Sequence, residues 1–492
     1  MITSNEGQTR KDEQWQKLLE WLKTEHNMDV GKDGLRVECR QTRESGKGLF
    51  ASQPCSPSAT LFTIPARAMI NVKTLSLLYP PNTLAALNAT QIISLHLFLH
   101  KPSAENISCD PSFGPYISSL PQDFSSHPLA WTQHASQHVV NQDLLSSLPS
   151  ILSLALRSLR TRFREDWKAV REHLKANPSS IIHTARAELR HRQDDISEQA
   201  HEDAFMWAWL NVNTRCIYYR LNANQAAPEN MAMCPILDLA NHAPTNSHIF
   251  PVLPSSIFSP APGARKNKSH GLGGDYMFLS TSERSIQTGE ELFLKYGEHS
   301  NAKLFVEYGF VNGWSKGDCQ RGGFVGEVNL KYVVEEIFEK RGAVGAWMRS
   351  VLEEEGYWGD WTMHSSPTPA HPSYRLMAAL RLYHIVSESV TQLPSDHESL
   401  VDDWRRVLIG QQDLISSTNE QKWRDHLVEL CERVAKSAEL GLGHLASTVE
   451  RLRERDTPPW FNWMVGNIRL LWQEELEVAE AVAHSVKAGE EF

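Results

Sequence analysis

The chain has few of the features that mark secreted, membrane-spanning or metal-cluster proteins. Its seven cysteines are odd in number, widely spaced and never arranged as Cys-x-x-Cys, which indicates neither a disulfide framework nor a structural zinc cluster. The apolar runs, such as 151–156, fall far short of the roughly 20 residues that span a bilayer. We therefore expect an intracellular, reduced protein without a metal and without a membrane segment.

Positive charge is also scarce. The sequence has 49 lysines and arginines against 59 aspartates and glutamates, a net charge of −10, which argues against nucleic-acid binding through a broad basic face. Residues 1–14 are polar and lack the apolar core of a signal peptide. The basic run 265–268 is too short for a nuclear signal. We expect a cytoplasmic and/or nuclear protein that does not bind nucleic acid directly.

At 492 residues the chain is long enough for two or three domains. Short strand patterns occur near 35–64 and 276–295, whereas helical periodicity dominates between them and beyond 314. This order of strand and helix patterns predicts an α+β fold in which a small-sheet, β-rich domain is split by a helical insert and followed by an all-α domain. The expected parts are a helix at 1–30, a split domain at 31–313 with its insert at 70–205 and a mobile loop at 243–274, and a helical domain at 314–492.

Three local patterns make further predictions. Segments 276–279 and 292–295 flank Thr288-Gly289-Glu290 and are typical of a hairpin. The segment 111–131 has too many prolines for a helix interior. His96 and His100 have the i, i+4 spacing of many zinc sites, but no third ligand is evident in the sequence, so a partly exposed helix face is favoured.

Residues 46–51 match the dinucleotide fingerprint G-x-G-x-x-A. That motif requires a helix to begin there, and Pro54 and Pro57 interrupt any such helix within two turns. No acidic residue occurs in 64–71, where this motif places the side chain that binds the ribose. A tight turn between two strands is therefore the favoured interpretation.

Two segments carry the strongest functional signal. Residues 234–242 form an apolar run that ends in Asp238, Asn241 and His242, and burying such side chains is costly unless each is hydrogen-bonded. Some 50 residues later, 289–310 contains Tyr296 and Tyr308, each followed by glycine. Each feature alone is more often structural, but together, in this order and at this distance, they favour a functional site.

These segments resemble the two halves of the methyltransferase site in SET-domain proteins. Further matches indicate the subgroup of the Rubisco large-subunit lysine methyltransferase type, and the resemblance extends over about 15–480. The matching blocks are 46–51, 115–121, 207–215 and 374–381, with Thr214 replacing the usual serine. The resemblance implies a SET domain split by a helical insert and followed by a helical substrate-binding domain.

The resemblance also implies roles for individual residues. S-adenosylmethionine would be the cofactor, and Tyr296, with Tyr308, would be the catalytic tyrosine at the lysine channel. Residues implied in cofactor binding are Ser45, Gly46, Lys47, Arg215, Asp238, Asn241, His242, Tyr296, Tyr308, Gly309 and Phe310. Ser45 stands where relatives often have an acidic residue, but a backbone contact tolerates this change.

The implied activity is methylation of a lysine side chain in a non-histone protein, plausibly a ribosomal or translation protein. The protein substrate would dock on the C-terminal helical domain of a monomeric enzyme. Two alternatives remain open: a protein-histidine methyltransferase, and a catalytically silent SET-fold scaffold. The intact sequence Glu307-Tyr308-Gly309-Phe310 favours lysine, and the retention of Asn241, His242 and Tyr296 argues against a silent scaffold.

Overall fold

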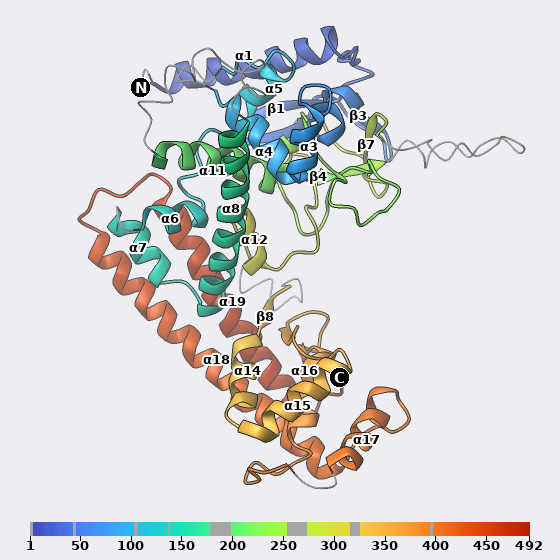
Figure 1. Cartoon of the computed structure of the whole chain (residues 1–492), viewed down its shortest axis with the longest axis vertical. Helices are drawn as coiled ribbons and strands as arrows, with labels where there is room; N and C mark the ends of the chain where they lie inside the picture. The colour runs from blue at the N-terminus through green and yellow to red at the C-terminus, as the bar shows by residue number, and fades with distance from the viewer. Residues whose placement is uncertain are drawn as a thin grey trace, which may run out of the picture. The chain divides into compact units, whose positions relative to one another are not determined.

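A computed structural model describes residues 3–42, 46–102, 107–135, 138–177, 198–252, 273–314, 325–393 and 397–492. The chain divides into two compact units, the first formed by Met1–Ser125 with Leu159–Glu298 and the second by Ser126–Ser158 with His299–Phe492. Figure 1 shows the elements of both units. The domain boundaries expected from the sequence remain a prediction.

The first unit combines short strands with helices. Its strands are β1 (Val37–Gln41), β2 (Lys47–Ala51), β3 (Thr60–Ile64), β4 (Cys216–Tyr218), β5 (Met231–Met233), β6 (Ile249–Val252) and β7 (Tyr276–Ser280). Its helices are α1 (Thr3–Thr24), η1 (Ala66–Ala68), α2 (Val72–Leu75), α3 (Pro81–Ala86), α4 (Ala89–Leu99), α5 (Gly114–Ser119), α11 (Glu198–Arg215) and η2 (Leu237–Leu239). Helix α8 (Ser150–Ala176) is divided between the two units.

The strands of the first unit form small antiparallel sheets, β1-β2, β3-β7-β6 and β4-β5. Strand β7 pairs with β3 and β6, so the hairpin predicted between 276–279 and 292–295 is wrong. The second segment instead pairs with β2, because the Leu49 carbonyl accepts a hydrogen bond of 2.8 Å from the Leu292 amide. Strand β6 lies inside the predicted loop 243–274, of which 253–272 fall outside the described residues.

Residues 47–51 are the strand β2, antiparallel to β1 with Gln41 opposite Lys47. No helix begins at this glycine motif, which rules out the dinucleotide-binding interpretation and agrees with the predicted turn between strands.

The proline-rich segment 111–131 contains α5 and the start of α6 (Pro128–His134). Both helices carry a proline in their first turn, where no amide hydrogen is needed.

Helix α4 is buried on most of its surface. A capping box between Asn88 and Gln91 begins it, and its side chains pack against α11. The partly exposed face predicted for its two histidines is wrong, because His96 and His100 are both buried. The ring of Phe113, which stands just before α5, covers His96 edge-on at 5.7 Å. Figure 1 shows α1 lying along α5.

The second unit is mainly helical. Its helices are α6, α7 (Val139–Ser146), α12 (Asn301–Tyr308), α14 (Lys331–Glu339), α15 (Gly342–Glu354), α16 (Tyr374–Tyr383), α17 (His397–Leu408), α18 (Ser417–Leu452) and α19 (Phe461–Lys487). A small sheet that the sequence patterns did not predict, β10-β9-β8, adds β8 (Glu327–Asn329), β9 (Thr362–His364) and β10 (His371–Pro372).

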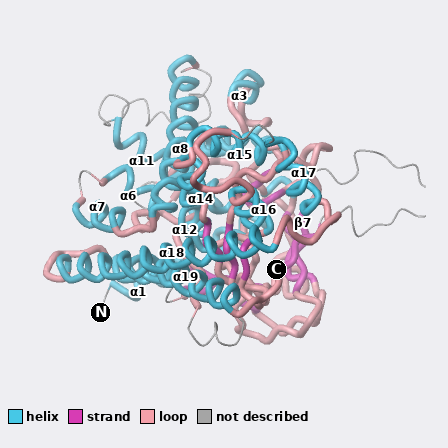
Figure 2. Tube along the Cα trace, turned by 90° about the horizontal axis from the view of Figure 1, so that it is seen from below, coloured by secondary structure: helices cyan, strands magenta, loops and turns pink. Residues whose placement is uncertain are grey.

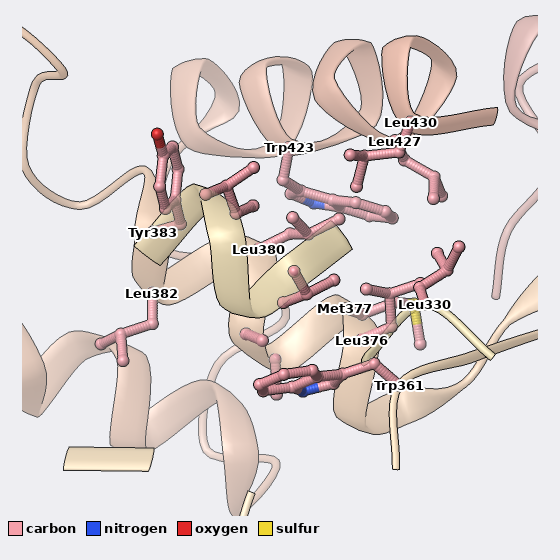
Figure 3. Close-up of a cluster of buried hydrophobic side chains, with 14 of the residues drawn as sticks. Leu330, Trp361, Leu376, Met377, Leu380, Leu382, Tyr383, Trp423, Leu427 and Leu430 are labelled. Atoms are coloured by element: carbon pink, nitrogen blue, oxygen red, sulfur yellow. The ribbon is translucent and has the colours of Figure 1, made fainter. Parts of the chain in front are cut away.

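The core of the second unit is built around α16. Figure 3 shows Leu380 of this helix facing Trp423, Leu427 and Leu430 of α18, with Trp361 on the other side of the helix. Helices α18 and α19 run side by side along most of their length (Figure 2). Two long helices that bury one face against a common core give this unit a continuous apolar interior.

Within the described residues, no helix combines the length and the apolar character that crossing a membrane requires.

Glu474 of α19 is a buried acid in this unit. Its carboxylate accepts hydrogen bonds from the Asn301 side chain (2.6 Å) and the Glu327 amide (3.0 Å). Burial raises the pKa of Glu474 to about 7, although these two hydrogen bonds favour the charged form. The folded protein therefore holds a proton here at pH values where the unfolded chain, with an ordinary glutamate pKa near 4.3, has lost it.

We predict that Glu474 lowers the stability as the pH rises through the interval from about 4.5 to 7. Since one pKa unit corresponds to about 1.4 kcal/mol, the free energy of unfolding should fall by about 3 kcal/mol across this interval. Glu474→Gln should remove this part of the pH dependence in urea unfolding curves. Exposed Glu480→Gln on the same helix is the control. Parallel pH profiles for the parent and Glu474→Gln would contradict the prediction.

Candidate active site

In the first unit, the segment 289–294 lies between two other parts of the chain. Its Leu292 amide donates to the Leu49 carbonyl of β2. On the other side, the Leu294 amide donates to the Asn241 carbonyl (2.9 Å), and the Ala243 amide donates to the Leu294 carbonyl (3.2 Å). This pairing joins the glycine turn before β2, the polar end of the segment 234–242 and the residues leading to Tyr296.

The side chain of Asn241 connects these three segments. Its amide nitrogen donates to the Lys47 carbonyl (3.2 Å) and to Oε1 of Glu291 (2.8 Å). Gly48 is needed here, because a Cβ atom on it would lie 2.7 Å from Glu291 Oε1 and 3.1 Å from the Asn241 nitrogen. Our sequence reasoning missed Glu291. The only signal was an acidic residue at the start of the segment that precedes Tyr296.

Asp238 is a buried acid next to an arginine. The Tyr116 hydroxyl donates to its Oδ2 (3.2 Å), and the Arg215 guanidinium donates to its main-chain carbonyl and lies 4.0 Å from Oδ2. Burial raises the pKa of Asp238, and the positive charge of Arg215 only partly offsets this. Asp238 Oδ1 and Arg215 Nε are buried, and neither has a hydrogen-bond partner among the described residues. Both atoms are suited to a polar ligand.

The backbone before Asp238 is strained. Ile236 has φ of +68°, a conformation that a β-branched residue rarely adopts and that costs about 1–3 kcal/mol. The strained residue starts the short helix η2, which sets the direction of the Asp238 side chain. Strain of this kind is concentrated at functional sites. It distinguishes 234–242 from an ordinary buried run.

His242 and Tyr296 lie together at the end of the paired segment. The Tyr296 amide donates to Nδ1 of His242 (3.1 Å), and the centroids of the two rings are 5.0 Å apart. The Tyr296 hydroxyl donates to the Ala240 carbonyl (2.8 Å). The phenol oxygen is thus held at a defined place, and a phenol oxygen can accept a hydrogen bond as well as donate one.

Tyr308, Gly309 and Phe310 are described in the second unit. Tyr308 ends α12, and Gly309, with φ of +82°, donates its amide to the carbonyls of Leu304 and Phe305 as a left-handed helix cap. The Tyr308 ring lies 6.1 Å from that of His299 and 6.2 Å from that of Phe310, measured between centroids. Burial raises the pKa of Tyr308, so its hydroxyl is protonated at neutral pH.

The residues expected from the sequence are thus distributed as follows. The first unit brings together the start of β2, the end of α11, the segment 234–242 and the residue that follows 289–295. The expected residues there are Gly46, Lys47, Arg215, Asp238, Asn241, His242 and Tyr296. The second unit holds Tyr308, the last residue of α12, with Gly309 and Phe310 after it. Ser45 lies outside the described residues. The individual roles of all these residues remain predictions. Tyr116 lies in the matching block 115–121, but the sequence patterns predict no role for it.

No family model matches the chain. In sequence it is similar to human "SET domain-containing protein 4", with 27% identity over 69% of this chain and 66% of that protein. It is also similar to "Ribosomal lysine N-methyltransferase set11" of Schizosaccharomyces pombe, with 26% identity over 80% of this chain and 82% of that protein.

Solved structures show the same fold. "Crystal structure of the SET domain of LSMT bound to Lysine and AdoHcy" has a TM-score of 0.58 and 19% identity, over 97% of this chain and 93% of the other. "Structure of Rubisco LSMT bound to AdoMet" has a TM-score of 0.53 and 17% identity, over 96% and 93%. The chain therefore has a SET fold. Its resemblance to the Rubisco large-subunit lysine methyltransferase type, and the predicted α+β fold class with a helical C-terminal region, are confirmed.

The glycine after Tyr308 provides a test of the α12 cap. Gly309→Ala should destabilise the second unit by about 1–2 kcal/mol, because an L-residue is disfavoured in the left-handed region. The new methyl group would also lie 3.1 Å from the His127 ring. Gly313→Ala, with no atom within 4 Å of the added carbon, is the matched control. Equal denaturation midpoints for the two variants would rule out the cap as a stability determinant.

Proposed function

We propose that this chain is an S-adenosylmethionine-dependent protein-lysine N-methyltransferase. The observation that carries the proposal is the convergence of Gly46–Gly48, Asn241 and the strained segment 234–242 in a SET fold. Relatives named as lysine methyltransferases and structures described as bound to AdoMet or AdoHcy support it.

The residues in the first unit fit the cofactor. Its amino-acid part carries an ammonium and a carboxylate, which need acceptors and donors respectively. Arg215 offers a buried Nε–H without a partner among the described residues, and Asp238 offers an equally unpartnered Oδ1. At Gly48 the lack of a Cβ lets the Asn241 and Glu291 side chains pack against the main chain beside these groups. Arg215, Asp238, Asn241 and the backbone near Gly46 would hold the cofactor.

When bound, the cofactor supplies an electrophilic methyl group on a positively charged sulfur. The attacking lysine amine must be neutral, and its ordinary pKa is about 10.4. Desolvation and a nearby positive charge both lower that pKa, so no strong general base is needed. Tyr296 donates its hydroxyl hydrogen to Ala240, so its oxygen can accept a hydrogen bond from the amine N–H. The role we assign to Tyr296 is to orient the amine.

We further propose that the substrate is a ribosomal or translation protein. This follows the names of two relatives, set11 and the Saccharomyces cerevisiae "Ribosomal lysine N-methyltransferase 2". Tritiated cofactor, the purified protein and ribosomes from cells lacking it should give one labelled protein band. Mass spectrometry then identifies the residue. Label on histidine would favour the histidine alternative, and no label from ribosomes but label from another fraction would refute the ribosomal assignment.

The C-terminal helical half is our candidate for docking that substrate to a monomeric enzyme. Tyr374, Ile409 and Leu414 are large apolar side chains that remain exposed there. The Tyr374 hydroxyl donates to the carbonyl of Leu408, at the end of α17, so Tyr374 lies beside the segment that bears Ile409. Such exposed apolar groups are typical of protein contact surfaces.

Cofactor binding should depend on Asn241. Asn241→Ala leaves the Lys47 carbonyl and the Glu291 carboxylate without their shared donor, at a cost of about 1–3 kcal/mol. Calorimetry should show affinity for S-adenosylhomocysteine reduced by about tenfold or more. Exposed Asn222→Ala in the same unit is the control. A folded Asn241→Ala protein with parental affinity would overturn the site assignment, and a parent that does not bind would favour the silent scaffold.

Tyr296→Phe tests the orientation of the lysine amine separately from cofactor binding. It keeps the ring next to His242 and removes only the hydroxyl that bonds to Ala240. Turnover should fall by about a hundredfold, because misplacement of a reacting group costs that much. Affinity for S-adenosylhomocysteine should persist. Tyr218→Phe, which alters a tyrosine that is 49% exposed, is the control. Parental turnover by Tyr296→Phe would mean that the hydroxyl is structural.

A further inference from the structure

Three buried side chains with metal-binding atoms meet at the C-terminal end of α4. His96 and His100 stand one helical turn apart, and Asp110 lies in the loop before α5. Their exposed fractions are 1%, 4% and 6%. One nitrogen or oxygen atom from each residue lies within 4.8 Å of those of the other two. None of these residues has a role in the methyltransferase site proposed above.

Each histidine nitrogen lies near one oxygen of the Asp110 carboxylate, His96 at the separation of tetrahedral metal ligands and His100 slightly beyond it. Nε2 of His96 lies 3.2 Å from Asp110 Oδ2, and Nε2 of His100 lies 3.9 Å from Asp110 Oδ1. Zinc bonds of about 2.0–2.1 Å to nitrogen and oxygen place tetrahedral ligands about 3.3 Å apart. Small side-chain movements would therefore bring all three residues to one ion.

Both histidines approach the same carboxylate, His96 at its Oδ2 and His100 at its Oδ1. A carboxylate between two imidazoles is an arrangement that can bind a metal ion. The His96 and His100 rings are close, with centroids 4.6 Å apart. We propose that His96, His100 and Asp110 bind a divalent transition-metal ion, with Zn²⁺ the best match to two imidazoles and one carboxylate.

Neighbouring groups hold the three ligands in place. The Tyr79 hydroxyl lies 3.0 Å from Nδ1 of His96, where it can accept the ring N–H and leave Nε2 free to bind a metal. The Phe113 amide donates to Asp110 Oδ2 (2.8 Å). The Ser108 hydroxyl donates to the His100 carbonyl (2.7 Å), which attaches the loop to the end of α4. Such support is what a metal centre requires of its surroundings.

A cavity reaches one member of the cluster, Asp110. It has a volume of about 470 Å³ and is lined by residues of α1 and of the loop and helix at 107–118, including Asp110. Its other charged residues are Glu13, Glu20, Glu25 and Lys17. An excess of carboxylates raises the local concentration of cations. The cavity thus supplies an entry path and water for the fourth coordination position.

The ion would stabilise the first unit from the inside. It would connect α4 to the loop that leads into α5, and Tyr116 of α5 donates to Asp238. We assign the ion a structural role, because the three ligands belong to elements that support Tyr116 and are themselves buried. Metal binding and methyl transfer are therefore separate properties that can be measured independently.

The second unit offers a matched comparison in His384, Glu388 and His426. There Nε2 of His384 and Nδ1 of His426 are hydrogen-bonded to each other at 2.9 Å, and Glu388 is exposed. The hydrogen bond between the two rings gives each of these two nitrogens a partner without a metal. His384→Phe therefore serves as the control variant.

The test uses the full chain, purified without a histidine tag, and measures bound zinc by mass spectrometry. After removal of metal, calorimetric titration with ZnCl₂ should restore one equivalent. His100→Phe and Asp110→Asn should weaken zinc binding at least a hundredfold, and Tyr79→Phe by about 10–100-fold. His384→Phe should bind like the parent. A parent that takes up no zinc, or parental binding by both His100→Phe and Asp110→Asn, would overturn the proposal.

Cobalt gives a readout that does not depend on the folding of a variant. The parent loaded with Co²⁺ should show the intense visible absorption of a four-coordinate site. A weak spectrum typical of six oxygen ligands would contradict the proposed ligand set. Circular dichroism of each variant shows whether a loss of zinc reflects loss of ligands or loss of fold. Affinity for S-adenosylhomocysteine in the same samples tests the methyltransferase proposal separately.

Discussion

The pairing of 289–294 with two distant segments is the constraint on which the site depends. It places β2 on one side and 241–243 on the other, so that Asn241 can bond to both Lys47 and Glu291. Without this pairing, the Asn241 side chain would lose the Glu291 carboxylate as a partner. The backbone pairing brings hydrogen-bonding partners to the half-buried Asn241 side chain, and this side chain in turn joins three parts of the chain.

Much of this site could be predicted from the sequence, because its residues interrupt patterns that otherwise indicate buried chain. Asp238 and Asn241 end an apolar run, and Tyr296 ends a strand-like one. The partners could not be predicted, since strand pairing depends on contacts between residues far apart in the sequence. The expected hairpin at Gly289 was wrong for this reason. The glycine turn indicated that 292–295 pairs with 276–279, but in the folded chain 292 pairs with β2 instead.

The helices were predictable to a similar degree. The long periodic segments of α8, α18 and α19 occur where the periodicity indicated, whereas the three short strands β8, β9 and β10 carry too few residues to show a period of two. Burial of polar groups was the hardest property to predict. His96 and His100 show helical spacing in the sequence, but only the loop containing Asp110 and Phe113, some ten residues later, encloses them.

The separation between Leu49 and Leu292 has a consequence for biosynthesis. Strand β2 has β1 as a neighbour almost immediately, but its other edge meets its partner only after more than 200 further residues have been made. At about 5–20 residues per second, that interval lasts on the order of ten seconds or more. An open strand edge is a template for pairing with other chains. The nascent protein thus passes through a period in which this edge of β2 is open to pairing with other chains, and chaperones can protect it there.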